Sequence, residues 1–284
     1  MTSLPQPPIE TCYRHPDRET GRHCSRCGKA ACSDCLVQAS VGSQCRDCAK
    51  AGQPSTGVRV RRWTASKPTL VTYAIIAVNL AVFVWLAARD AGALGSRLTE
   101  GQFDLGLNKR LLNATDEWYR LVSSGFIHFG VLHLLMNMLL LFQLGQMLEP
   151  LLDRTRFALL YFACLLGGSL GVLILDGNSL SITGGASGAV FGLMTAAAIG
   201  LHRRGVNIFS TGLGTVLLLN IVLTFSIAGI SKGGHLGGIA AGAVCALGML
   251  APSWKAPPKW VTYATPVAVG VVAVIASVII TKSA

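Results

Sequence analysis

The chain has 284 residues, of which 51% are hydrophobic and only 13% are charged. Because a soluble domain carries about 25% charged residues, this composition excludes a protein that is soluble throughout. The net charge of +11 does not indicate nucleic-acid binding, since the basic residues gather beside apolar runs, as they do on the cytosolic side of a membrane. Residues 1–67 are polar and rich in cysteine, whereas 68–284 are dominated by apolar segments. We therefore expect a small soluble head followed by a polytopic membrane domain.

Seven of the nine cysteines lie in the first 48 residues, in four paired units with two residues between the members of each pair. The pairs are Cys12 and His15, Cys24 and Cys27, Cys32 and Cys35, and Cys45 and Cys48. Both members of such a pair can bind one ion from a single tight turn. Eight such ligands make two tetrahedral zinc sites with no open position, which is typical of structural zinc. A head of about 40 residues needs them, because it cannot bury a sufficient core by itself.

A disulfide scaffold is the alternative for these cysteines. It is disfavoured because the N-terminus lacks a signal-peptide pattern, which predicts a cytosolic head, and because one of the ligands is a histidine. The pattern resembles a B-box-type cross-brace zinc finger. The resemblance implies that Cys12, His15, Cys32 and Cys35 hold one ion and that Cys24, Cys27, Cys45 and Cys48 hold the other. Sequential pairing stays open, His23 is left as a surface residue, and docking to a protein partner, regulation and stabilisation are all compatible with the head.

The chain divides into four predicted regions: a zinc-binding head over 1–50, a basic linker over 51–68, a six-helix core over 69–251 and an extra C-terminal membrane helix over 252–284. The apolar segments that define the helices run over 69–88, 129–148, 157–175, 185–201, 208–229, 234–251 and 261–281. Most have the length of about 20 residues that a spanning helix needs. With the N-terminus in the cytosol, the short basic connections lie inside and the 89–128 loop lies outside, which predicts a multi-pass protein of the cell membrane.

The 89–128 loop is half apolar. Its large side chains suit the interface between lipid and water, and they are Phe103, Leu105, Leu107, Leu111, Leu112, Trp118 and Tyr119. His128, at the end of this loop, is expected at the same interface and is assigned no chemistry.

Polar side chains within the apolar segments are functional candidates, because a membrane interior makes them costly. Four stand out: His133, Asn137, Ser187 and His235. Their helices run in the same direction, and 16, 14 and 16 residues separate His133, Ser187 and His235 from the cytosolic ends of those helices. At a rise of about 1.5 Å per residue, all three lie about 21–24 Å above the inner boundary.

A serine and a histidine at one depth suggest a nucleophile and its general base. All 13 acidic residues lie at or before Asp176, and Asp176 itself is expected too shallow to support His235. We therefore predict a Ser187–His235 dyad without a third acid. His133 and Asn137 share one face of a helix, and with the Ser187 backbone N–H they could form an oxyanion hole. The whole prediction depends on shared depth and direction, because GASG alone is a common packing motif.

Glycines flank both members of this dyad. Gly185 and Gly188 surround the serine, and a four-residue stripe of Gly234, Gly238 and Gly242 surrounds the histidine. Such stripes allow close helix packing, which would bring Ser187 to His235. Phe191, one turn after the serine, is expected to pack on the histidine ring.

These segments resemble the rhomboid intramembrane serine proteases. The resemblance is carried by HFGVLHLLMN (128–137), GASG (185–188) and GGHLGGIAAG (233–242), with Glu149 in addition. EWYR (117–120) is similar to the family's Trp-Arg loop element, but here Tyr119 separates the two residues. The resemblance implies an all-α core of six helices plus a seventh, an active site that opens toward the outer face, and no cofactor for catalysis.

The activity that the resemblance implies is hydrolysis of a peptide bond in or near the transmembrane segment of a membrane-protein substrate. A catalytically inactive rhomboid-like protein that binds transmembrane clients is the alternative. A transporter is disfavoured, because the last four apolar segments contain no acid that could pair with a charge at the midplane.

Overall fold

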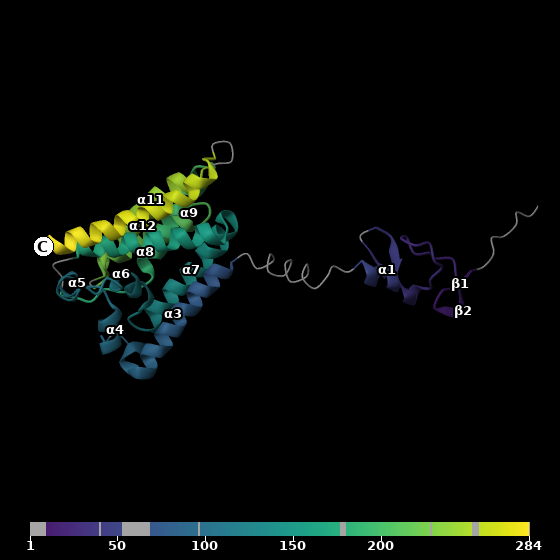
Figure 1. Cartoon of the computed structure of the whole chain (residues 1–284), viewed down its shortest axis with the longest axis horizontal. Coiled ribbons are helices and arrows are strands. Elements are labelled where there is room, and N and C mark those ends of the chain that lie inside the picture. Colours follow the sequence, from purple (N-terminus) through teal and green to yellow (C-terminus); the bar gives the residue numbers. More distant parts are fainter. Residues whose placement is uncertain are drawn as a thin grey trace, which may run out of the picture. The chain divides into compact units, whose positions relative to one another are not determined.

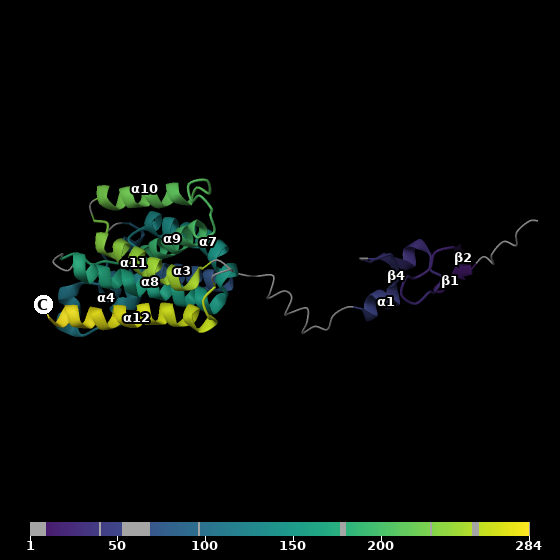
Figure 2. The same ribbon diagram turned by 90° about the horizontal axis from the view of Figure 1, so that it is seen from above.

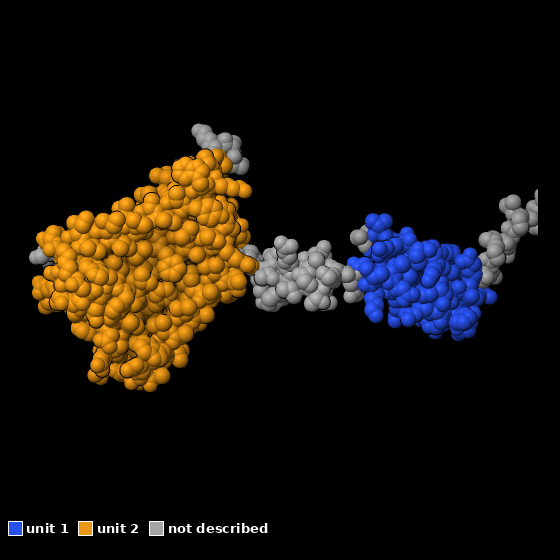
Figure 3. Space-filling view, viewed as in Figure 1, with its two compact units in different colours: residues 1–66 blue, residues 67–284 orange. Residues whose placement is uncertain are grey.

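The computed structural model describes residues 10–39, 41–52, 69–95, 97–176, 180–227, 229–251 and 256–283. The chain folds as two compact units, residues 1–66 and 67–284 (Figure 3). Most of the predicted basic linker, residues 53–68, lies outside the described residues, and so does Lys255 of the basic connection before the last helix.

The first unit consists of two small antiparallel hairpins, a 3₁₀ turn and one short helix. These elements are β1 (Glu10–Cys12), β2 (His15–Thr20), η1 (Ser33–Cys35), β3 (Leu36–Gln38), β4 (Ser43–Cys45) and α1 (Arg46–Ala51). Cysteines and a histidine lie at the ends of several elements: β1 ends at Cys12, β2 begins at His15, and the Cys45 sulfur caps α1 by accepting from the Cys48 N–H. The buried residues of the unit are mostly these cysteines, so there is almost no other core.

The second unit is helical throughout its described part. Its long helices are α3 (Leu70–Arg89), α7 (Val131–Leu152), α8 (Arg154–Leu175), α9 (Ser187–His202), α10 (Leu213–Ser226), α11 (Lys232–Met249) and α12 (Lys259–Lys282). Each matches one of the seven predicted apolar segments. The mostly helical membrane fold expected from the sequence is therefore confirmed.

α10 is shorter than the predicted segment 208–229. Local side-chain bonds compete with the helix before Leu213: the Ser210 hydroxyl donates to the Asn207 carbonyl and the Thr211 hydroxyl to the Ile208 carbonyl, both at 2.7 Å. Gly212 then takes a left-handed conformation with φ of 75°, which breaks any helix that enters from the N-terminal side.

Four of these helices, α3, α7, α8 and α12, are long and apolar enough to cross a membrane. α9 and α10 are apolar but have only 16 and 14 residues. Their lengths of about 24 and 21 Å fall short of a hydrocarbon core about 30 Å thick. Large apolar side chains such as Leu132, Leu219 and Ile279 are more than half exposed along α7, α10 and α12, as expected of helices that face lipid.

α8 is the central helix of this unit, and α9, α11 and α12 pack on it (Figures 1 and 2). Its fully buried Phe157, Leu160 and Tyr161 form the middle of the main apolar core. α10 and α12 lie on opposite sides of the bundle (Figure 2), and α3 packs against α7.

The 89–128 loop is folded rather than irregular. It contains η2 (Ala91–Leu94), α4 (Glu100–Leu105), α5 (Lys109–Thr115), α6 (Arg120–Ser123) and η3 (Ser124–Phe126). Phe103 and Tyr119 are exposed, as an interfacial position requires. The same expectation is wrong for Leu107 and Leu112, which are buried with Leu121, Val172 and Leu173 in a second small core.

Candidate active site

Ser187 and His235 lie side by side. Ser187 is the first residue of α9, and His235 lies in the first turn of α11. The Ser187 Oγ is 2.8 Å from the His235 Nε2, which is the distance of a good hydrogen bond and within the reach that a general base needs. The two predicted dyad residues therefore meet in the geometry expected of them.

Backbone-to-backbone packing of α9 on α11 produces this contact. A Cβ added to Gly188 would lie 3.0 Å from the Gly234 carbonyl oxygen, and one added to Gly192 would lie 2.7 Å from that of Gly238. Only glycine fits at such approaches, because real Cβ contacts are longer. α8 meets α11 in the same way, through Gly167 and Gly171. The small-residue stripes thus set the distance between serine and histidine.

Two further side chains orient the His235 ring. Phe191 stacks on it with 4.1 Å between ring centroids and 22° between planes, as its spacing from Ser187 predicts. Thr224 of α10 places its Oγ1 2.7 Å from the His235 Nδ1. The sequence analysis does not identify Thr224, because a threonine inside an apolar helix ordinarily bonds only its own backbone.

His133 lies near the serine, with its Nε2 beside Gly185. The Phe129 N–H donates to the His133 Nδ1 at 3.3 Å, so the ring proton belongs on Nε2, where it is free to donate. A Cβ built on Gly185 would lie 2.9 Å from that Nε2 and 3.7 Å from the Ser187 Oγ. Gly185, with φ of 133°, therefore leaves open the space that both groups face.

Asn137 lies one turn after His133 and is buried. Its Nδ2 donates one hydrogen to the His133 carbonyl at 2.9 Å, and an amide nitrogen carries a second hydrogen. The backbone N–H of Ser187 belongs to the first turn of α9, where amides have no partner within the helix. These donors are the ones that the sequence predicts for an oxyanion.

His128 is fully buried, so the expectation that it lies at the lipid interface is wrong. Its Nε2 accepts from the Ala186 N–H at 3.4 Å, and its ring lies edge-on to His133 with 5.0 Å between centroids. His128 thus supports the backbone next to Ser187. The sequence signal was its place five residues before His133, on the loop that enters α7.

Asp176 binds the start of α11 rather than His235. The Ser231 hydroxyl donates to its Oδ2 at 2.6 Å, and the Gly233 N–H donates to the same oxygen at 3.2 Å. Both ring nitrogens of His235 have hydroxyl partners, Thr224 and Ser187. The aspartate fixes the helix end that carries the histidine.

The profile of the rhomboid domain family matches residues 115–252. This stretch, a little under half of the chain, is therefore similar to rhomboid domains. It contains the serine, both histidines of the site and the asparagine.

Curated relatives are similar to this chain over the same part. The Rhomboid protease GluP of Bacillus subtilis (strain 168) is 31% identical over 188 residues, which are 64% of this chain and 36% of that protein. The RHOMBOID-like protein 4 of Arabidopsis thaliana is 37% identical over 145 residues, which are 48% of this chain and 35% of that protein. The Putative rhomboid protease YdcA of Bacillus subtilis (strain 168) is 27% identical over 176 residues, which are 61% of this chain and 84% of that protein. The chain thus spans only about a third of the length of the first two.

Two polar networks outside the dyad connect parts of the helical unit. The buried Glu149 accepts from the N–H groups of Val71 and Thr72 at 2.9 and 2.8 Å, and from the Thr72 hydroxyl at 2.7 Å. It therefore caps α3 from the far end of α7. In the loop, the buried Arg120 donates to the Phe103 and Gly106 carbonyls at 2.7 and 2.9 Å.

Trp118 and Arg120 make different contacts in the loop before α7. The buried Arg120 forms an ion pair with the partly exposed Glu117 at 2.5 Å, and its hydrogen bond lowers the pKa of the Glu117 carboxyl. Trp118 is half-buried and lies under Lys282 at the end of α12, with 6.0 Å between the ammonium and the ring centroid. Lys282 also pairs with Asp116 at 2.6 Å, so the loop is bound to the last helix.

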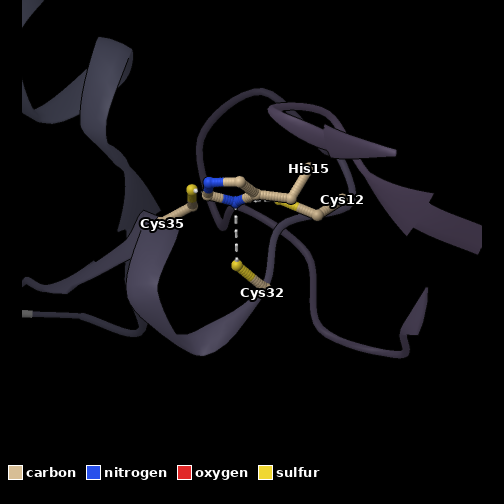
Figure 4. Close-up of side chains that lie close together, drawn as sticks. All are labelled: Cys12, His15, Cys32 and Cys35. Atoms are coloured by element: carbon tan, nitrogen blue, oxygen red, sulfur yellow. Dashed lines mark hydrogen bonds between the residues drawn. The ribbon is translucent and has the colours of Figure 1, made fainter. Parts of the chain in front are cut away.

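The head lies outside the matched rhomboid domain and carries two candidate metal centres. Cys12, His15, Cys32 and Cys35 form one cluster, and Cys24, Cys27, Cys45 and Cys48 form the other. In each, the ligand atoms lie within 4.8 Å of one another (Figure 4 shows the first). These two groups have the membership of the cross-brace pairing and not that of the sequential one. All nine cysteines of the chain are free, which also argues against the disulfide scaffold.

The cluster dimensions fit a tetrahedral ion. His15 Nδ1 lies 3.4 Å from the sulfurs of both Cys32 and Cys35, and the sulfurs of Cys27 and Cys45 are 3.8 Å apart. Zinc bonds of about 2.3 Å to sulfur and about 2.0–2.1 Å to nitrogen give tetrahedral edges of about 3.6–3.8 Å. Backbone hydrogen bonds, that with Cys45 first, lower the pKa of Cys24 to about 6, which favours the thiolate that binds metal.

His23 is outside both clusters. Its Nε2 pairs with the Glu10 carboxylate at 3.0 Å on the surface, in keeping with the surface role expected for it.

Proposed function

We propose that this protein is an intramembrane serine endopeptidase that cleaves a peptide bond in or near the transmembrane segment of membrane-protein substrates. The observation that carries the proposal is the 2.8 Å separation of the Ser187 Oγ and the His235 Nε2. The rhomboid domain and its named protease relatives support it. Catalysis in this proposal needs no cofactor.

Ser187 acts as the nucleophile. As its Oγ attacks the substrate carbonyl carbon, its proton passes to the His235 Nε2. The carbonyl oxygen becomes an oxyanion, and the Nε2–H of His133, the free Nδ2 hydrogen of Asn137 and the Ser187 N–H can donate to it. His235 then returns its proton to the leaving amine, which leaves an ester on Ser187. Water, activated by the same histidine, hydrolyses that ester and restores the free serine.

The substrate reaches Ser187 from within the bilayer. In this proposal the C-terminal end of α9 lies at one boundary of a hydrocarbon core about 30 Å thick, and the helix runs along the membrane normal. Because α9 is about 24 Å long, the serine at its first residue then lies about 6 Å below the other boundary. A peptide bond at that depth belongs to the end of a transmembrane segment. In our proposal this boundary is the outer one of the cell membrane, and the head is in the cytosol.

Covalent labelling tests the proposal. Purified protein in detergent or liposomes is incubated with a fluorophosphonate probe and, separately, with a model transmembrane substrate. We expect wild type to be labelled and to cleave, and Ser187→Ala and His235→Ala to lose at least about 10³-fold of the cleavage rate. Cleavage that persists in Ser187→Ala would reject the mechanism. A folded wild type that binds transmembrane segments but is never labelled would instead support an inactive, client-binding protein.

The head, in a second part of the proposal, holds two structural zinc ions in the cross-brace clusters. Four protein ligands around each ion leave no open position for a substrate or water. Its small core of cysteines makes folding dependent on the metal.

A further inference from the structure

Thr224 occupies the position next to His235 where serine hydrolases carry an acid. It is 2% exposed, and its Oγ1 lies 2.7 Å from the His235 Nδ1. The same oxygen lies 2.7 Å from the Asn220 carbonyl oxygen, one turn earlier in α10. Both contacts are short; the one with His235 is buried and the one with Asn220 is partly buried. At 2.7 Å, each contact is favourable only if a hydrogen lies between the two atoms.

Only one arrangement of protons satisfies both contacts. A hydroxyl has a single hydrogen, and a carbonyl oxygen can only accept. The Thr224 hydrogen therefore goes to Asn220, and the threonine oxygen is left to accept. The His235 Nδ1 must then carry the ring proton and donate it to Thr224. The opposite choice would place two lone pairs 2.7 Å apart at Asn220.

This tautomer is the one that general-base catalysis needs. With the proton on Nδ1, the neutral ring presents a lone pair at Nε2, and that atom faces the Ser187 hydroxyl at 2.8 Å. With the proton on Nε2, the ring would donate to the serine oxygen and could not accept its hydrogen.

We propose that Thr224 is a positioning residue that fixes His235 in the tautomer able to deprotonate Ser187. The inference rests on the proposed function and extends it to a residue of α10. When the serine proton reaches Nε2, the ring becomes an imidazolium with two N–H groups, and the Nδ1–H bond to Thr224 strengthens because its donor is now charged. The neutral hydroxyl thus takes the orienting role of the missing acid, at a site where an unpaired carboxylate would be costly.

Through this hydrogen bond, the orientation of the His235 ring also depends on the position of α10. Of the 14 residues of this helix, Gly214 and Thr224 are the buried ones, and Figure 2 shows α10 at the edge of the bundle. Four other residues of α10 pack on the main apolar core while only partly buried: Leu213, Val216, Leu217 and Ile221. Thr224 is the one of its two buried residues whose side chain bonds His235.

The test compares two substitutions at Thr224 with a matched control. Thr224→Val keeps the shape and removes the hydroxyl, whereas Thr224→Ser keeps the hydroxyl. Thr195→Val is the control, because the Thr195 hydroxyl makes the same one-turn bond, to the Phe191 carbonyl at 2.9 Å, without a histidine. We expect Thr224→Val to lower kcat by about 10–10²-fold with KM changed less than about 2-fold, and to slow fluorophosphonate labelling equally. Thr224→Ser and Thr195→Val should stay within about 3-fold of wild type.

The outcomes separate this proposal from the one it rests on. Wild type that cleaves, with Thr224→Val equal to it, overturns the role of Thr224 alone. Thr224→Ser as slow as Thr224→Val does the same, since the hydroxyl would then not matter. Wild type that neither cleaves nor labels overturns the proposed function. The tautomer is checked without activity by ¹⁵N NMR of histidine-labelled protein, with His235→Ala for assignment: a protonated Nε2 in neutral wild-type His235 would refute the assignment, even if Thr224→Val fails to fold.

Discussion

A methyl group at Gly238 should separate the catalytic pair. A Cβ added there would overlap the carbonyl oxygen of Gly188, the residue after Ser187, and would lie 2.7 Å from the Gly188 carbonyl carbon. Carbon atoms pack at about 3.5–4.0 Å, and backbone cannot rotate away as a side chain can, so α9 and α11 must move apart by about 1 Å. The Ser187–His235 distance of 2.8 Å would then exceed the reach of about 3.2 Å for proton transfer.

We expect Gly238→Ala to lose about 10²-fold of the cleavage rate, the usual cost of a misplacement of about 1 Å. Overpacking should also lower the free energy of unfolding by about 1–3 kcal/mol. Gly270→Ala in α12 is the control, because its Cβ would meet only the Leu166 Cδ1, at an ordinary 3.5 Å. It should cleave like wild type and be equally or slightly more stable. Cleavage and probe labelling at the wild-type rate in folded Gly238→Ala would refute the idea that helix spacing sets the dyad.

Three further predictions concern the metal centres and the polar networks. Full-length protein should contain about two zinc ions per chain by mass spectrometry, Cys24→Ser about one, and the surface variant His23→Ala still about two; a wild-type content near zero would contradict the cross-brace. The lowered pKa of Glu117 means that its ion pair stabilises the fold above the unfolded pKa, and that this stability is lost as the pH falls through the folded pKa. Glu117→Gln should therefore lower Tm near pH 7, and this difference should disappear once the pH has fallen below the folded pKa. A Tm difference that persists in acid would disprove this. Glu149→Gln should lower the free energy of unfolding by about 1–3 kcal/mol, because one amide hydrogen must face the donors of Val71 or Thr72; an unchanged Tm would show that the cap is dispensable.

The helices of the membrane unit could be predicted because apolar length is a local property of the sequence. The loop before α7 could not. Its helices have four to seven residues, too few to form alone, and they depend on distant partners. Arg120 bonds carbonyls 14 and 17 residues earlier, and Leu107 forms an isolated antiparallel bridge with the distant Thr183. Composition alone placed Leu107 and Leu112 at the lipid surface, whereas these long-range contacts bury them.

The cross-brace of the head shows a similar limit. Spacing identifies each Cys or His pair, since two ligands two residues apart share one turn. It says nothing about which pairs share an ion, because that depends on how β1, η1 and β4 fold back on one another. The sequence therefore left two pairings open, and the clusters of ligand atoms select one.

The two histidines of the site differ in a way that no sequence pattern carries. In His133 the Phe129 N–H donates to Nδ1, which places the proton on Nε2 and makes the ring a donor. In His235 the Thr224 oxygen accepts from Nδ1, which leaves Nε2 as an acceptor. Both Nε2 atoms face the neighbourhood of Ser187, so one neutral ring can take the serine proton while the other donates to the oxyanion. Each tautomer is fixed by a single uncharged partner, the Phe129 backbone amide for His133 and the Thr224 hydroxyl for His235. Two identical side chains can therefore take opposite roles without a carboxylate bonded to the His235 ring.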